Sequence, residues 1–141
     1  MDDKIKQSLI DIVKSCENVA LGTLGLNEYP EIRTVMNALN KNAENLNLHF
    51  ITSIASPKYE QLQNNSNVCL YYFNSDTHMA MRLFGKIITH QDEISRAKYW
   101  NDNWKMYGYA DANDPKYCVL EFQPESYKFY QGPAKFTGII D

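Results

Sequence analysis

Strand-like segments that follow one another along the chain are the feature that most restricts the fold of these 141 residues. Each segment combines β-branched or aromatic residues with an alternation of apolar and polar side chains, which is typical of strands. They cover residues 17–26, 31–39, 46–52, 67–73, 79–90, 117–123 and 126–131. Because they come mainly in adjacent runs, the pattern predicts an antiparallel barrel or sheet over an alternating parallel fold.

Helical patterns interrupt this series at three places. Apolar residues recur at spacings of three and four from Asp2 to Cys16, a short helix is expected after Ser56-Pro57, and a longer one is expected from Asp92 to Met106. Gly85 lies inside the longest strand, where small barrels use a bend or bulge to turn a corner. The sequence therefore predicts one mainly β domain, a β-barrel with peripheral helices.

The composition argues against several classes of function. A net charge of -3, from 14 basic and 17 acidic residues, gives no electrostatic basis for binding nucleic acid or an anionic membrane. The three cysteines are far apart and lack a C-x-x-C spacing, which predicts neither a zinc site nor a disulfide framework. No apolar run approaches the ~18 residues of a membrane span, and the first residues are acidic. We therefore expect a cytoplasmic protein with reduced thiols.

The segment FITSIASPKYEQL, residues 50–62, has the composition of an anion site. Ser56 is a good N-cap and Pro57 suits the first helical position, so Lys58 falls in the first turn of a helix. A basic residue opposes the helix dipole there, whereas a bound anion would be stabilised by the free N–H groups and by the lysine. Thr52 and Ser53 add hydroxyl donors suited to a phosphate monoester. The alternative is an ordinary strand-to-helix turn with capping serines and a solvated lysine.

A second basic residue, Arg33, lies in the strand EIRTVMNAL. On a strand, Arg33, Val35 and Asn37 share one face, and Thr34 and Met36 share the other. An arginine in the middle of an otherwise apolar strand normally has a specific anionic partner. That partner is either a bound anion or a nearby glutamate, and the residues alone leave both open.

The order of these motifs resembles the flavin-binding split-barrel family of pyridoxamine 5'-phosphate oxidase, in its short branch similar to general stress proteins. The resemblance runs from about Val19 to Gly132 and rests on AxGTL, Arg-Thr-Val, FxT followed by Ser-Pro-Lys, and a later strand with an internal glycine. It implies a six-stranded antiparallel split β-barrel of Greek-key topology and FMN-binding type. It also implies a homodimer with two FMN molecules between the subunits.

The same resemblance assigns parts of this chain. Residues 1–16 would form the N-terminal helix, residues 17–132 the barrel with two inserted helices, and residues 133–141 a C-terminal tail. Arg33, Thr34, Val35 and Met36 would run beside the isoalloxazine ring, Thr52 and Ser53 would supply hydroxyl contacts, and Ser56 and Lys58 would hold the phosphate. Tyr127 and Tyr130 stand near the place where family members often carry a tryptophan close to the partner's flavin.

The leading hypothesis is therefore an FMN-dependent oxidoreductase in which the flavin supplies the redox chemistry and no side chain acts as nucleophile or metal ligand. Its partners would be a second copy of the chain and a small-molecule substrate or electron donor such as NAD(P)H. One alternative is a flavin-binding or stress-response module without turnover. Another is a relative that uses F420 or haem, and haem would require an axial histidine such as His78 or His90. The three histidines are too scattered to predict a metal site.

Overall fold

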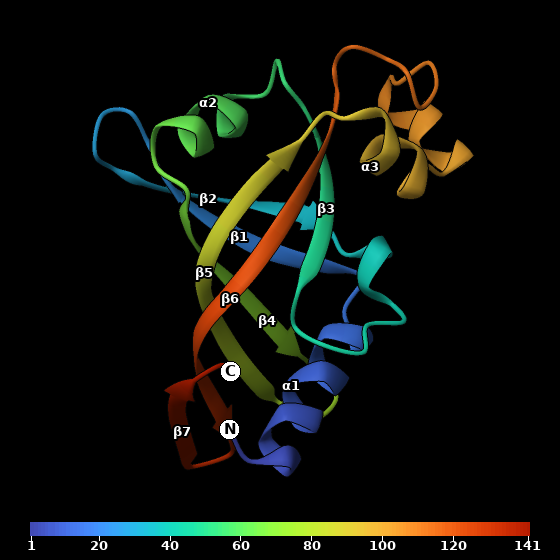
Figure 1. Ribbon diagram of the computed structural model, residues 1–141. Helices are drawn as coiled ribbons and strands as arrows, with labels where there is room; N and C mark the ends of the chain where they lie inside the picture. The colour runs from blue at the N-terminus through green and yellow to red at the C-terminus, as the bar shows by residue number, and fades with distance from the viewer.

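The computed structural model describes residues 1–141 as one antiparallel sheet, curved into a split barrel and flanked by short helices (Figure 1). The helices are α1 (Asp3–Ser15), α2 (Pro57–Asn64), α3 (Glu93–Lys98) and the 3-10 helices η1 (Ala38–Asn40) and η2 (Asp102–Tyr107). The strands are β1 (Asn18–Leu24), β2 (Pro30–Met36), β3 (Leu48–Ser53), β4 (Asn67–Asn74), β5 (Met79–His90), β6 (Tyr117–Gln131) and β7 (Ala134–Ile139). No helix is both long and apolar enough to cross a membrane.

The strand order creates an opening in the barrel. Hydrogen bonds connect the strands in the order β2-β1-β4-β5-β6-β3, and β7 extends the other half of β6. The two outermost strands of this order, β2 and β3, are not paired with each other. Figure 1 shows α1 at the end of the barrel where both termini lie, and α3 at the opposite end. The barrel is therefore split between β2 and β3.

Local sequence signals account for the helix boundaries. Asp2 caps α1 by accepting from the backbone N–H groups of Lys4 and Ile5, and Ser56 caps α2 directly before Pro57. The apolar face of α1 buries Leu9 and Val13 completely against the sheet. The predicted N-terminal helix and the predicted start of the second helix are both confirmed.

Gly85 allows the long strands β5 and β6 to cross closely. The register of this pair shifts between Phe84 and Gly85, which leaves Glu125 of β6 without an opposite residue. A Cβ atom on Gly85 would clash with the backbone oxygen of Gln123, so no larger residue fits without movement. The predicted bulge at Gly85 is confirmed.

The segments predicted at 117–123 and 126–131 form one strand, not two separated by a turn. Pro124 is tolerated inside β6 because it lies at the bulge, where β6 also changes its second neighbour from β3 to β7. Residues 134–139 of the expected tail form β7, so the sheet has seven strands where six were expected.

The helix predicted from Asp92 to Met106 is also divided. It ends after Lys98, and η2 begins at Asp102. Asn101 is extended and its side chain accepts from the backbone N–H of Asn103, which starts a new helical turn in place of continuing the old one. We call residues 93–109, which include α3 and η2, the insert.

Candidate functional site

The split between β2 and β3 forms a pocket of about 290 Å³. The strands face each other there without backbone pairing, and the insert closes one side. Its lining comprises Thr34, Val35 and Met36 from β2, Ile51, Thr52 and Ser53 from β3, Ser56 and Lys58 at the start of α2, and Tyr107 and Tyr109 from the insert. We call it the split pocket. It brings together seven of the ten residues predicted to bind a cofactor.

Hydroxyl groups and backbone N–H groups gather where β3 leads into α2. The Oγ atom of Ser56 accepts from the backbone N–H of Lys58 at 3.3 Å, and Oγ of Ser53 accepts from the N–H of Ala55 at 3.1 Å. Thr52 is buried at the end of β3. No aspartate or glutamate lines the pocket. This corner can therefore donate several hydrogen bonds and carries no carboxylate that would repel an anion.

Lys58 gives the split pocket a positive charge that no carboxylate balances. Its ammonium donates to Oγ of Ser56 at 3.0 Å, and it takes part in none of the four ion pairs of the chain. Burial lowers the pKa of Lys58, and the nearby positive charge of Arg33 lowers it further. A bound anion would oppose both effects, because it favours the charged form of the lysine.

Arg33 is not among the residues that line the split pocket. Its guanidinium donates to Oγ1 of Thr23 at 2.7 Å, to the carbonyl of Leu21 at 3.2 Å and to Oε1 of Gln61 at 3.0 Å. Burial lowers the pKa of Arg33, and the charge of Glu31 opposes that effect. The structure therefore places Arg33 in a polar network beside the pocket, where its charge still acts on Lys58.

The two tyrosines predicted near a partner's flavin lie on different faces of β6. Tyr127 is a buried member of the main core, and its ring lies against Gly138 of β7. Tyr130 lies on the outer face, where the Arg82 guanidinium carbon is 5.7 Å from its ring centroid. A step of three residues along a strand reverses the side-chain direction, so Tyr127 is buried and only Tyr130 is partly exposed.

The insert contributes lining residues that sequence reasoning did not assign to the site. Tyr107 and Tyr109 reach the split pocket from the insert, and Ile51 lines it directly before the predicted Thr52 of β3. Tyr109 packs edge-on against Tyr117 and is mostly buried, and this burial raises its pKa to about 12. The spacing of aromatic residues around Trp104 predicts a packed cluster and does not indicate a pocket. Tyr109 follows Gly108, whose left-handed backbone, with φ of 95°, ends η2 and turns the chain.

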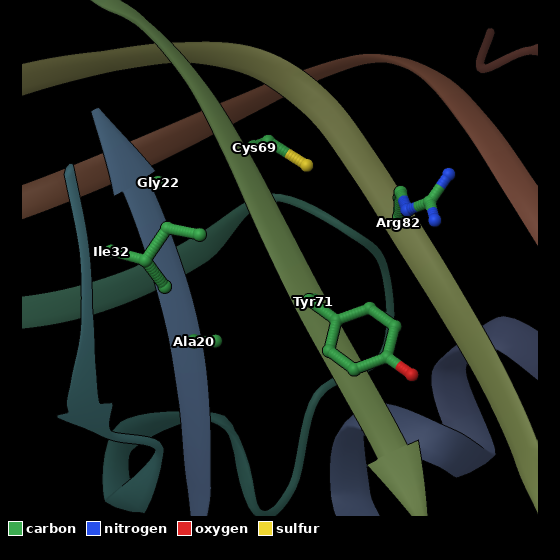
Figure 2. A pocket seen from close by; sticks show the side chains of 6 residues that line it. All are labelled: Ala20, Gly22, Ile32, Cys69, Tyr71 and Arg82. Atoms are coloured by element: carbon green, nitrogen blue, oxygen red, sulfur yellow. The ribbon is translucent and has the colours of Figure 1, made fainter. Parts of the chain in front are cut away.

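A second pocket, of about 350 Å³, lies on the outer face of β2, β1, β4 and β5. Figure 2 shows Ala20 and Gly22 on β1 beside Cys69 and Tyr71 on β4, with Arg82 at one border. Large apolar side chains are exposed around it, including Ile32 at 76%, Tyr71 at 41% and Phe73 at 46%. We call this surface the outer apolar face. It contains none of the predicted hydroxyl donors.

The chemistry of the split pocket is that of binding. It offers hydroxyl groups, a lysine and aromatic walls, which suit a ligand with a phosphate and a flat ring. None of the three histidines lines it, and no cluster of three histidine, cysteine or acidic side chains in the chain could hold a metal ion. The pocket's one close pair of a hydroxyl and an amine is Oγ of Ser56 with Nζ of Lys58, and the same Oγ also accepts from the backbone N–H of Lys58 as the cap of α2.

Similar structures match this fold over nearly the whole chain. A protein related to general stress protein 26 from Clostridium acetobutylicum, of the pyridoxinephosphate oxidase family, is 27% identical with a TM-score of 0.86, covering 100% of this chain and 98% of its own. General stress protein 26 from Bacillus anthracis is 20% identical with a TM-score of 0.75, covering 94% and 97%.

A third similar structure is a pyridoxamine 5'-phosphate oxidase-related, FMN-binding protein from Nostoc punctiforme. It is 16% identical with a TM-score of 0.69, covering 96% of this chain and 91% of its own. No curated protein sequence shows significant similarity. The family model described as pyridoxamine 5'-phosphate oxidase like matches residues 4–140. The chain therefore belongs to the pyridoxamine 5'-phosphate oxidase-like family.

Proposed function

We propose that this protein is an FMN-dependent oxidoreductase that holds the phosphate end of the flavin in the split pocket. The observation that carries the proposal is the half-buried Lys58 without a carboxylate partner, set among hydroxyl groups at the start of α2. Membership of the family and the FMN-binding protein among the similar structures support the same ligand. The flavin would supply the redox chemistry, and this chain would bind and orient it.

The proposal includes a homodimer. Exposed apolar patches of this kind on a small domain commonly mark an interface. We expect the outer apolar face to pack on a second copy, with Arg82 and Tyr130 at its border. An aromatic ring at that border would be able to cover one side of a flat ligand held by the partner.

Two other cofactors lead to different expectations. One similar structure is an F420 reductase, 17% identical with a TM-score of 0.63, and a deazaflavin would use the same anion-binding corner. Haem would need an axial ligand, but His49 and His90 line a different cavity and His78 lies in the turn before β5. The split pocket therefore favours a flavin or deazaflavin over haem.

The decisive test compares FMN with riboflavin, which lacks the phosphate, in the protein and in Lys58→Met. A charge-assisted hydrogen bond contributes about 1.5–3 kcal/mol, which corresponds to a roughly 10- to 150-fold weaker FMN affinity in the variant. Riboflavin affinity should stay within about two-fold, because this ligand does not reach Lys58. Lys14→Met, at an exposed position in the last turn of α1, is the control and should change neither affinity.

Two results would contradict the proposal. If the wild-type protein does not bind FMN, the cofactor is wrong. If Lys58→Met weakens FMN and riboflavin equally, the lysine does not contact the phosphate. F420 should be titrated in the same way, since tighter binding than FMN would reassign the cofactor.

Turnover is tested separately, by adding NADH or NADPH to the flavin-loaded protein without oxygen. Loss of the flavin absorption band near ~450 nm, a property of the cofactor itself, is expected if the protein is an oxidoreductase that uses these donors. A bound flavin that no donor or substrate reduces would favour the alternative of a flavin-binding module without turnover.

A further inference from the structure

A polar cavity of about 480 Å³ lies outside the barrel between β3, β6 and α3. Its lining includes Asn45, Asn47 and His49 before and within β3, Lys98 at the end of α3 with Tyr99 after it, and Glu121 from β6. No residue lines both this cavity and the split pocket. The proposed function leaves the cavity without a role.

Glu121 provides a negative charge on the floor of the cavity. Its Oε2 atom accepts from the amide of Asn47 at 3.0 Å, and Oε1 lies 2.7 Å from Nε2 of His90. The Asn47 hydrogen bond is the main cause that holds the pKa of Glu121 below its usual value, so the carboxylate is ionised at neutral pH. No lysine or arginine pairs with it, and a carboxylate with hydrogen bonds from Asn47, His90 and Gln123 retains capacity to accept one more.

Lys98 provides a positive charge on the wall. Its ammonium lies 5.3 Å from the ring centroid of Tyr99 and takes part in no ion pair. The Tyr99 ring is fixed in turn by stacking on His49, with ring centroids 4.4 Å apart. The two opposite charges therefore line one cavity without forming an ion pair with each other.

The remaining polar groups favour a ligand that is polar throughout. Oδ1 of Asn45 accepts from the backbone N–H of Asn47, which leaves the Asn45 amide hydrogens free to donate. Asn47 donates its amide nitrogen to Glu121, and its Oδ1 atom accepts no hydrogen bond from the protein. A cavity with one unpaired cation, one carboxylate and free amide groups complements a molecule that carries both charges.

We propose that this cavity binds a small zwitterion of the α-amino acid class, with its carboxylate on Lys98 and its ammonium group on Glu121. The amides of Asn45 and Asn47 then contact the polar end of the ligand. The site is separate from the split pocket, so the proposal does not depend on FMN binding.

L-glutamine is the probe, because its side-chain amide matches the asparagines, and amide chemical shifts of the full-length protein report binding. Two analogues separate the charges: 4-carbamoylbutanoate lacks the ammonium group, and 4-aminobutanamide lacks the carboxylate. Saturable shifts around the cavity are expected with glutamine, and each analogue should bind at least about ten-fold more weakly, since each loses one charge-assisted contact.

Variants assign the contacts. Lys98→Ala and Glu121→Gln should each weaken glutamine binding by at least about ten-fold. Lys128→Ala is a matched control, because its ammonium also lies over an aromatic ring, 5.8 Å from the centroid of Phe84. Lys58→Ala is a second control and should affect only anion binding in the split pocket.

Three results would overturn this inference. The first is the absence of saturable shifts with glutamine in the wild-type protein. The second is equal affinity for glutamine and 4-carbamoylbutanoate, which would indicate a simple anion site. The third is that Lys58→Ala weakens glutamine as much as Lys98→Ala does, which would place the ligand in the split pocket. None of these outcomes bears on whether FMN binds.

Discussion

Replacing Asn37 with leucine should destabilise the protein by removing four buried hydrogen bonds, one of which is the only bond of a buried hydroxyl group. Asn37 is fully buried at the end of β2, where its amide donates to the carbonyls of Val13 at 2.7 Å and Cys16 at 2.8 Å. Its Oδ1 accepts from the Tyr72 hydroxyl at 2.8 Å and from the Asn40 amide at 3.0 Å. This side chain therefore joins α1, β4 and the end of β2, directly beside the split pocket.

The cost can be worked out bond by bond. In the leucine variant the two carbonyls and the Asn40 amide each keep another partner, whereas the Tyr72 hydroxyl loses its only one. Three lost bonds at about 1 kcal/mol each, plus about 1–3 kcal/mol for the unpaired hydroxyl, give a loss of roughly 4–6 kcal/mol. Tyr72→Phe alone should cost about 1 kcal/mol, because Asn37 still accepts from Asn40.

The double variant tests this reasoning. Asn37→Leu with Tyr72→Phe no longer buries an unpaired hydroxyl, so it should be about 1–3 kcal/mol more stable than the sum of the single variants predicts. Urea unfolding at one fixed protein concentration, without added flavin, measures the stability of all four proteins. In thermal unfolding, the Tm of Asn37→Leu should fall by roughly 13–20 °C, because the unfolding entropy is about 2.1 cal/mol/K per residue. Additivity within about 0.5 kcal/mol would refute the argument that the Tyr72 hydroxyl becomes unpaired.

Three further predictions concern single sites. Gly85→Ala should cost at least about 2 kcal/mol in urea unfolding, because its Cβ atom meets the Gln123 backbone; Gly22→Ala, with 3.5 Å to its nearest neighbour, is the milder control. Ser56→Ala should cost about 1 kcal/mol through loss of the α2 cap, and an unchanged Tm would contradict that role. Backbone N–H groups of residues 110 and 116 hold the pKa of Asp114 below 3.8, so its stabilisation is present above that pH and is lost as the pH falls through the lowered pKa. Asp114→Asn should therefore be less stable than the wild type at neutral pH, and the difference should shrink on acidification.

Local sequence signals predicted most elements of the fold. Period-two alternation identified the strands, and the apolar spacing of three and four after Asp2 and the Ser56 cap identified two helix starts, because these signals depend only on neighbouring residues. The errors arose where tertiary context overrides such signals. Pro124 indicated a turn, yet the bulge opposite Gly85 lets the strand continue, and β7 forms only because β6 offers an edge.

The site shows the same division. Thr52, Ser53, Ser56 and Lys58 are close in sequence, so one strand end and one helix start bring them together. Strand alternation already placed Arg33 on the opposite face from Thr34, although the family resemblance grouped them. The polar network around Arg33 depends on Gln61, a residue 28 positions away, which no local pattern indicates.

The sequence by itself thus determined most of the strands, two helix starts and the corner of hydroxyl groups and Lys58, since each follows from the conformational preferences and hydrogen bonding of neighbouring residues. Only the tertiary structure decided that β2 and β3 face each other unpaired, that the insert supplies Tyr109, and that Tyr127 is buried whereas Tyr130 is partly exposed. These features depend on which distant segments share a sheet and how that sheet curves, and this is set by the packing of the whole core.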